Sequence, residues 1–174
     1  MTTPNPTPSS EQATVNSTTS GLQSLAPALE AIAEKLGVKS VLVMRSDPSS
    51  MVVAATAGTA SVHYPVGGAG QKAGEATDRV PLYCERAVDS GETLFVRDSR
   101  ADVTFAGNED ETEFGLSNYL GLPVRNADGN VVGTVCVLDD HSRDYDATAH
   151  RELDTLRGSV EAILRGDDTA LETE

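Results

Sequence analysis

The sequence predicts an α+β fold in which helices cover both faces of a central antiparallel sheet of about six strands. Pairs of β-branched segments separated by turn residues occur once in each half of the chain. Segments with helical spacing of apolar side chains precede, separate and follow these pairs. With 174 residues, of which 39% are hydrophobic, the chain is long enough for one such domain.

The first expected elements are an amphipathic helix and a hairpin. Apolar side chains recur at intervals of three and four through residues 22–36, and Gly37 follows as a helix stop. Residues 38–45 and 51–56 are rich in β-branched side chains and flank the turn-forming segment 46–50. They predict two antiparallel strands joined by a short turn.

The next stretch, from Gly58 to Gly74, is rich in glycine and predicts a flexible loop. The segment Gly67–Gly70 has a superficial likeness to a phosphate-binding loop. It lacks the Gly-Lys-Ser/Thr ending of such loops, and no clear strand-to-helix transition surrounds it. The flexible-loop interpretation is therefore favoured over phosphate binding.

Helical spacing returns in residues 80–90, and a short strand is expected at residues 93–96. Residues 98–117 are polar but contain Phe105 and Phe114. Isolated aromatic residues in a polar stretch predict a loop with a short helix lying on the core. Loops of this length in compact domains often carry function.

A second hairpin is predicted from the strands 119–124 and 131–138, because Asp128-Gly129 is a strong turn signal between apolar segments. Residues 131–138 are apolar at both alternating positions, so the pattern does not decide which side chains face a pocket. A last amphipathic helix is expected over residues 144–164, with its leucine, isoleucine and valine side chains on one side.

One domain is expected over residues 21–165, between a disordered tail at 1–20 and a disordered acidic tail at 166–174. No apolar run approaches the roughly 20 residues of a membrane span, and the start of the chain lacks the parts of a signal peptide. We therefore expect a cytoplasmic protein that has no membrane contact. A chain of this length also leaves no room for an output domain such as a kinase or cyclase.

Charge and cysteine content exclude further classes. The formal net charge of −14 argues against nucleic-acid binding, which requires clustered lysine and arginine side chains. Cys84 and Cys136 are too few for a disulfide framework and match no zinc-binding pattern. We expect both to be reduced, buried thiols.

The combination of residues 118–124 with the Asp-Gly turn and strand of residues 128–139 resembles a GAF domain. Residues 83–98 and 102–108 are similar to the middle of GAF domains in bacterial signalling proteins, so the resemblance covers about residues 22–164. It implies a sheet between two helical layers. One layer, formed by the terminal helices, often mediates dimerisation in this family, and the other covers a ligand pocket. A homodimer or a signalling kinase is the partner that the resemblance implies.

Thiol chemistry known in this family finds little support in the sequence. Free methionine-R-sulfoxide reductases are GAF enzymes that use several cysteines. Here Cys136 lies in an apolar strand and Cys84 lies within a predicted helix, away from its start, where a thiolate is not favoured. A cysteine that attaches a bilin is commonly followed by histidine in this family, and neither cysteine of this chain is.

Other ligands of the family are also disfavoured. We interpret His63, His141 and His150 as surface residues rather than haem ligands. The Asn-Lys pair common in relatives that bind cyclic nucleotides does not occur. A run of carboxylates lacks the spacing of a calcium loop, and a solvated charged surface is the favoured interpretation; its members are Glu109, Asp110, Glu111 and Glu113.

The remaining candidate is a small-molecule pocket beneath the long loop at residues 98–117. For the aromatic side chains a role in the core is slightly favoured, and for Asp98 a capping or turn contact is favoured. The choice of Tyr119 rests on the resemblance. The candidate ligand-binding residues are Cys84, Asp98, Phe105, Phe114, Asn118 and Tyr119.

We therefore expect a free-standing sensory GAF domain, not an enzyme, that binds an unidentified small molecule and signals through a helical interface with a second copy or a partner. No catalytic residue or metal ligand is predicted, and the sequence does not identify a cofactor. Two alternatives stay open: a protein-interaction module whose pocket has collapsed around Phe105 and Phe114, and a thiol-dependent enzyme that needs Cys84.

Overall fold

The computed structural model describes residues 21–76 and 78–166 of the chain. Apart from Gly166, the predicted tails lie outside the described residues. The strands are β1 (Ser40–Ser46), β2 (Ser50–Ala57), β3 (Ala69–Gln71), β4 (Leu94–Val96), β5 (Asn118–Arg125) and β6 (Val131–Asp139). The α-helices are α2 (Ala26–Leu36), α3 (Tyr83–Ser90), α4 (Glu109–Phe114) and α5 (Ala147–Leu164), with 3-10 turns η1 (Ser61–His63) and η2 (Ser99–Ala101).

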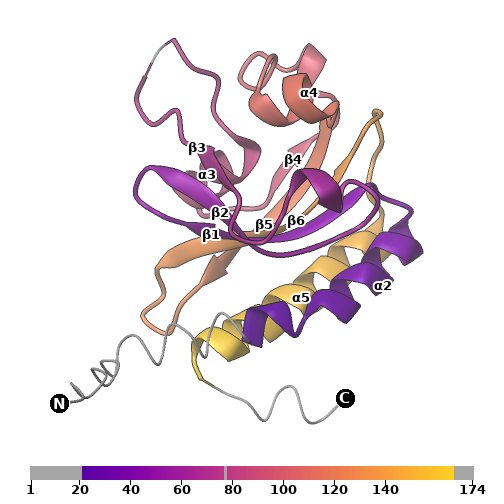
Figure 1. Cartoon of the computed structure of the whole chain (residues 1–174), viewed down its shortest axis with the longest axis vertical. Coiled ribbons are helices and arrows are strands. Elements are labelled where there is room, and N and C mark those ends of the chain that lie inside the picture. Colours follow the sequence, from indigo (N-terminus) through magenta and orange to yellow (C-terminus); the bar gives the residue numbers. More distant parts are fainter. Residues whose placement is uncertain (1–20, 77, 167–174) are drawn as a thin grey trace, which may run out of the picture.

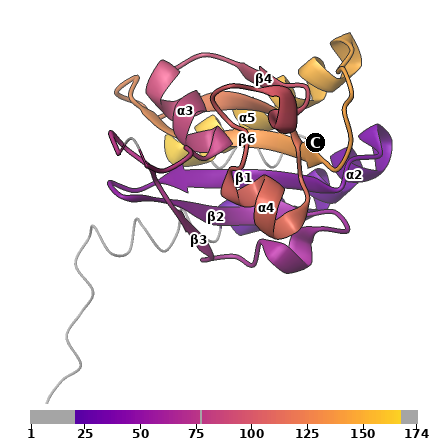
Figure 2. The same cartoon turned by 90° about the horizontal axis from the view of Figure 1, so that it is seen from above.

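The strands form one six-stranded sheet in the order β3-β2-β1-β6-β5-β4, and every neighbouring pair is antiparallel. Helices lie on both faces of this sheet (Figure 1; Figure 2). The predicted α+β architecture is therefore confirmed.

Helices α2 and α5 lie side by side on one face of the sheet, as Figure 1 shows. Gly37 ends α2 with a φ of 66°, a left-handed conformation that suits glycine. Asp146 begins α5, because its side chain accepts a hydrogen bond from the backbone N–H of Ala149 at 3.0 Å. The apolar stripes of both helices pack against the sheet and form the first core, which includes Leu29, Ile32, Val41, Val43, Leu120, Leu122, Val135, Val137, Leu153, Leu156 and Val160.

Helix α3, helix α4 and the connections around them cover the opposite face of the sheet. The second core beneath them includes Leu42, Met44, Met51, Tyr64, Leu82, Tyr83, Cys84, Phe105, Leu116, Tyr119, Cys136 and Leu138. The sheet lies between the two cores, and side chains of β6 point into both. Val135 and Val137 belong to the core beneath α2 and α5, whereas Cys136 and Leu138 belong to the core beneath α3 and α4. This assignment settles the question that the apolar pattern of β6 left open.

The glycine-rich stretch is more ordered than a flexible loop. Its residues Ala69–Gln71 form the edge strand β3, which pairs with Ser50–Val52 of β2. The sequence prediction missed this strand because an edge strand is held by backbone hydrogen bonds and needs no β-branched side chains. The end of the stretch is fixed by Glu85, whose buried carboxylate accepts hydrogen bonds from the backbone N–H groups of Ala73 at 3.0 Å and Gly74 at 2.8 Å.

Three predicted helices begin later than expected. The helix expected over residues 22–36 corresponds to α2, which begins at Ala26. The helix expected over residues 80–90 begins at Tyr83, and the one expected over residues 144–164 begins at Ala147. Across the described ranges 21–76 and 78–166, no helix has both the length and the apolar character needed to cross a membrane.

Candidate functional site

A small cavity of about 160 Å³ lies between the second face of the sheet and helix α4. We call it the α4 cavity. Strands β1 and β2 supply its apolar floor, the connection from η1 to β3 supplies one side, and α3 and α4 supply the others. Its wall residues include Met44, Met51, Tyr64, Cys84, Asp110 and Phe114.

Tyr64 and Asp110 make the main polar contact in this cavity. The Tyr64 hydroxyl donates a hydrogen bond of 2.6 Å to Asp110 Oδ1, which joins the segment after η1 to helix α4. Burial raises the pKa of the Asp110 carboxyl to about 6, although the hydrogen bond from Tyr64 acts in the opposite direction. Burial and the neighbouring carboxylate also raise the pKa of the Tyr64 hydroxyl, which therefore remains a donor.

Aromatic rings form the outer wall of the α4 cavity. The Phe114 ring stacks on the His63 ring with centroids 4.8 Å apart and meets the Tyr64 ring edge-on at 5.1 Å. These contacts hold η1 against α4, in addition to the hydrogen bond between Tyr64 and Asp110. Polar and aromatic contacts at the cavity wall thus join the segment that contains η1 to helix α4.

The structure corrects the interpretation of the acidic run as a solvated surface for Asp110 and Glu111, whereas Glu109 and Glu113 are exposed. Asp110 turns inward to Tyr64, and Glu111 accepts a hydrogen bond of 2.6 Å from the Ser99 hydroxyl. Asn108 caps α4, because its side-chain oxygen accepts a hydrogen bond from the backbone N–H of Glu111. The sequence signal was present, since an asparagine before three acidic residues marks a helix start.

Both cysteines are buried on the second face of the sheet. Cys84 lies in the first turn of α3, closer to a helix start than expected, and it lines the α4 cavity. Burial, reinforced by the nearby Asp110 carboxylate, raises the pKa of the Cys84 thiol well above its ordinary value. Burial likewise raises the pKa of Cys136 to about 12. A position near a helix start therefore does not produce a thiolate here.

Two of the other predicted site residues belong to the core beside the cavity rather than to its wall. Phe105 packs at a tilt on the Tyr83 ring with centroids 5.3 Å apart, and Tyr119 stacks on the same ring with centroids 4.9 Å apart. The Tyr119 ring lies across Gly121, where an added methyl group would overlap the hydroxyl group of the tyrosine. Gly121 thus provides the space in which Tyr119 lies flat against β5.

Asp98 and Asn118 lie away from the α4 cavity and make structural contacts. Asp98 caps η2 through the backbone N–H of Arg100 at 3.1 Å and accepts a hydrogen bond from the Ser142 hydroxyl. Asn118 is fully buried; its amide donates to backbone carbonyls that include Arg143 O at 2.9 Å. The structure therefore brings Cys84 and Phe114 together at the cavity, and places the other four predicted residues in the core or at the sheet end.

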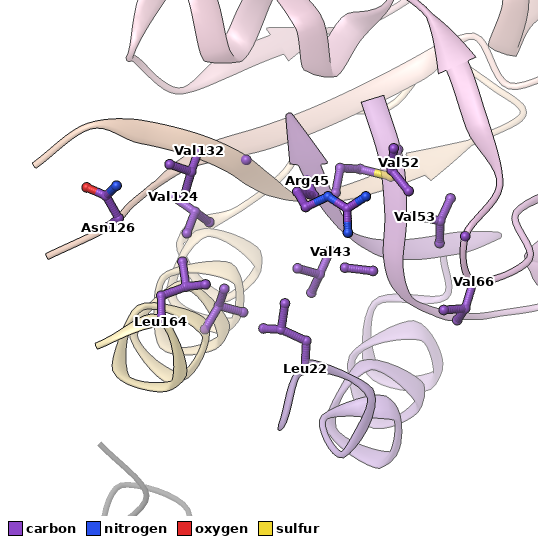
Figure 3. A pocket seen from close by; sticks show the side chains of 15 residues that line it. Leu22, Val43, Arg45, Val52, Val53, Val66, Val124, Asn126, Val132 and Leu164 are labelled. Carbon is purple, nitrogen blue, oxygen red and sulfur yellow. The ribbon is translucent and has the colours of Figure 1, made fainter. Parts of the chain in front are cut away.

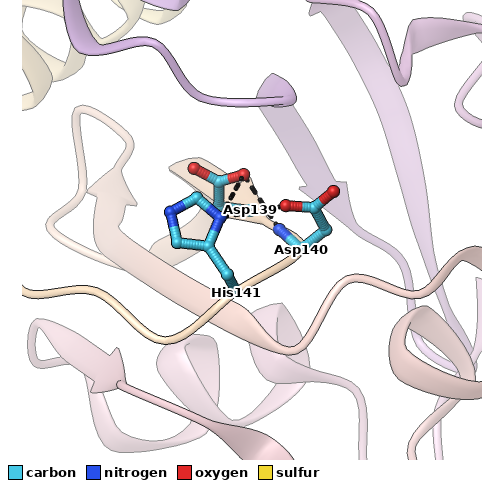
Figure 4. A group of neighbouring side chains, drawn as sticks. All are labelled: Asp139, Asp140 and His141. Atoms are coloured by element: carbon cyan, nitrogen blue, oxygen red, sulfur yellow. Dashed lines mark hydrogen bonds and ion pairs between the residues drawn. The ribbon is translucent and has the colours of Figure 1, made fainter.

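A second polar group occurs at the end of β6, where Asp139, Asp140 and His141 lie together (Figure 4). Asp139 is fully buried and forms an ion pair of 2.7 Å with Arg143. It also accepts a hydrogen bond from the backbone N–H of Asp140 at 2.9 Å. Its carboxylate is thus already matched by a guanidinium and a backbone donor, which identifies the group as an anchor for the connection to α5.

The sequence matches the family model of the GAF domain over residues 21–161, and the chain belongs to this family. The GAF domain is a sensory and regulatory fold of signalling proteins. A comparison with curated proteins gave no significant match.

Several solved structures share this fold. Free methionine-R-sulfoxide reductase of Neisseria meningitidis, in complex with its substrate, is 17% identical, with 98% of this chain and 99% of that chain covered and a TM-score of 0.64. The GAF domain of an Acinetobacter phosphoenolpyruvate-protein phosphotransferase is 16% identical, with coverages of 97% and 98% and a TM-score of 0.62. The cyanobacteriochrome receptor PixJ is 14% identical, with coverages of 87% and 98% and a TM-score of 0.63. Likeness at these identities establishes the fold and no common activity.

Proposed function

We propose that this chain is a cytoplasmic sensory GAF domain that binds a small polar molecule in the α4 cavity and responds by moving helix α4. The observation that carries the proposal is the hydrogen bond between Tyr64 and Asp110, which both line the cavity and belong to two separate segments. A ligand that replaces Tyr64 as the partner of Asp110 would separate these segments. Such a ligand acts by favouring the state in which the contact is open.

The walls of the cavity favour a ligand that carries an amine or another strong hydrogen-bond donor. Asp110 and Glu109 supply carboxylates, and the His63–Phe114 pair supplies aromatic faces that attract cations. The apolar floor at Met44 would take a short hydrocarbon part. A cavity of about 160 Å³ admits only a small molecule unless α4 moves outward.

The output of the sensor is proposed to pass through the outer face of α2 and α5, to a second copy of the chain or to a signalling kinase. The apolar stripes of both helices are covered by the sheet, so the exposed face carries charged and polar side chains together with small residues such as Ala28 and Ala31. An ion pair between Lys35 and Glu152 joins the two helices on this face. A partner would therefore be recognised mainly through charged and polar contacts.

A protein-interaction module with a collapsed pocket is a second candidate. It is favoured by the size of the α4 cavity, which is below the roughly 300–1,000 Å³ typical of small-molecule sites. Phe105 is buried against Tyr83 in the core beside the cavity, as this alternative expects of an aromatic side chain that serves packing. In this alternative the contact between Tyr64 and Asp110 is permanent.

The thiol-dependent enzyme receives less support, even though reductases are among the structures with this fold. Both thiols are buried and have raised pKa values, whereas a nucleophilic cysteine needs an accessible thiolate. A direct test is labelling of the native protein with iodoacetamide near neutral pH. We expect Cys84 and Cys136 to react only after unfolding; rapid labelling of Cys84 in the native state would favour the enzyme.

Native mass spectrometry tests the proposed function. The protein would be purified without denaturant and its native mass compared with its denatured mass. Cys84→Met fills the cavity, and Cys136→Ala is the matched control because it changes a buried thiol that does not line the cavity. We expect a non-covalent mass on the wild type and on the control, and none on Cys84→Met. If Cys84→Met retains the non-covalent mass, the ligand binds elsewhere. If the wild type carries no additional mass, the interaction module is favoured.

A further inference from the structure

A second cavity, of about 440 Å³, lies on the other face of the sheet, at the end where the two hairpins and the terminal helices meet (Figure 3). We call it the bulge cavity. Leu22, which precedes α2, and Val160 and Leu164 of α5 form its helical side. Val43 and Val124 form part of its sheet side. The volume lies within the range of typical small-molecule sites.

Irregular strand pairing creates this cavity. In the first hairpin Val43 pairs with Ala55 and Met44 pairs with Val53, so that Ala54 is the extra residue of a bulge. In the second hairpin Val124 pairs with Gly133 and Arg125 pairs with Val131, which makes Val132 the extra residue of another bulge. Both extra residues, Ala54 and Val132, line the cavity.

A β-bulge disrupts the ladder and bends its strand locally, and such irregularities are common at the edges of sites. Gly67 also lines the cavity, and a side chain built on it would meet no atom within 4 Å. Both bulges and Gly67 thus lie at the same end of the sheet as the cavity. The walls of the resulting space consist mostly of valine, leucine and alanine side chains.

One positively charged side chain lines this apolar cavity. Among the described residues that line the cavity, Arg45 is the only charged one. Figure 3 shows its guanidinium above Val43, directed toward the space ringed by Leu22, Val124 and Val53. The guanidinium donates to Asp47 through Nε at 3.0 Å and Nη2 at 3.2 Å. Since an arginine has five N–H donors, others remain for a second acceptor.

The ion pair between Arg45 and Asp47 is easily rearranged. The side chain of Arg45 is 51% exposed and that of Asp47 is 39% exposed. Exposed pairs of this kind contribute little to stability, so reorientation of the guanidinium toward another carboxylate has a small cost. A planar guanidinium also binds a carboxylate through two parallel hydrogen bonds.

We propose that the bulge cavity binds a medium-chain carboxylate, with its alkyl chain among the valine and leucine side chains and its carboxylate on Arg45. The apolar walls favour an alkyl chain in the ligand, and the positive charge of Arg45 favours an acidic head group. The ligand would contact Leu22 and Leu164, which lie next to the helices proposed for output. This site is separate from the α4 cavity and does not depend on a ligand there.

Isothermal titration of the full chain with decanoate and with decanol tests this proposal. Arg45→Met removes the cation, and Arg97→Met is the matched control because Arg97 forms an exposed pair with Asp144 elsewhere. Ala54→Leu fills the cavity from the inside. Val66→Phe obstructs it at an exposed rim position, where folding is least affected. Circular dichroism confirms that each variant is folded.

We expect one saturable site for decanoate in the wild type and in Arg97→Met. Arg45→Met should weaken decanoate about tenfold, the effect of one lost charge-assisted hydrogen-bonded pair, and leave decanol unchanged. Asp47→Asn should strengthen decanoate several-fold, because it removes the competing carboxylate. Both Ala54→Leu and Val66→Phe should reduce binding of the two compounds.

Three results would overturn the proposal. These are the absence of saturable decanoate binding, binding that Ala54→Leu and Val66→Phe leave intact, and an equal loss of decanoate and decanol in Arg45→Met. Sedimentation of the same samples distinguishes another occupant. If a second copy of the chain covers the cavity, the wild type sediments as a dimer that takes up no decanoate, which also contradicts the proposal.

Discussion

Replacing Asp110 with asparagine should change how the stability of the protein depends on pH. Burial raises the pKa of the Asp110 carboxyl from 3.8 to about 6 in the folded protein. The folded state therefore binds the proton more tightly than the unfolded state. The stability contributed by the protonated group is complete below about pH 4 and is lost as the pH rises through about 6.

The magnitude follows from the difference between the two pKa values. A difference of about 2 units, at 1.36 kcal/mol per unit, corresponds to a loss of about 3 kcal/mol. Because water reaches part of the Asp110 side chain, we expect a measured loss of about 1–3 kcal/mol. Asparagine does not ionise and keeps a carbonyl oxygen for the Tyr64 hydroxyl. Asp110→Asn should therefore gain stability over the wild type as the pH rises from about 4 to about 7, and no further above that.

Urea unfolding followed by circular dichroism, at a series of pH values from about 4 to about 8, measures this difference in free energy of unfolding. Glu113→Gln is the control, because Glu113 is an exposed carboxylate on the same helix. It shows what the loss of one exposed negative charge on this helix does by itself. The reasoning is refuted if the difference between Asp110→Asn and the wild type does not change with pH, or if Asp110→Asn is less stable than the wild type at about pH 8.

Three further substitutions test the contacts around the site. Tyr64→Phe removes the only hydrogen bond that a side chain donates to Asp110 in the described structure. It should lower the free energy of unfolding at neutral pH by about 1.5–3 kcal/mol. An unchanged midpoint of urea unfolding would contradict this contact. Gly121→Ala introduces a methyl group against a buried tyrosine and should lower the free energy of unfolding by about 1–3 kcal/mol. Gly158→Ala, in an open helical position, should raise the free energy of unfolding by about 0.5–1 kcal/mol. Equal effects of the two substitutions would refute the packing argument. Asn118→Ala leaves buried backbone carbonyl groups without a hydrogen-bond donor. It should therefore lower the melting temperature of the protein by several degrees. An asparagine that served only to bind a ligand would leave the melting temperature of the ligand-free protein unchanged.

The sequence was sufficient for the layered architecture, because periodicity and turn chemistry are local properties. Asp128-Gly129 predicted the second hairpin, and β5 and β6 pair across it. Edge strand β3 was missed because its pairing depends on the backbone of β2. The bulges at Ala54 and Val132 were also beyond prediction, since the register of two strands depends on packing against both cores.

The candidate site was predicted only in part. Cys84 and Phe114 line the α4 cavity, but the partner of Asp110 is Tyr64, which lies 46 residues earlier in the chain. No short-range pattern reports such a contact. Asn118 was predicted as a ligand-binding residue. Its partners are backbone carbonyls, as is usual for buried amides.

Mapping ligand contacts by nuclear magnetic resonance is the most direct test of a sensory site in the α4 cavity. Small amines and amino acids would be titrated into 15N-labelled protein, with Cys84→Met as the variant whose cavity is filled. The account predicts saturable shifts in the backbone amides of residues that line the cavity, such as Gly68, Gly70 and Asp110, and their loss in Cys84→Met. Saturable shifts that remain in Cys84→Met, or that occur only on the face covered by α2 and α5, would contradict it.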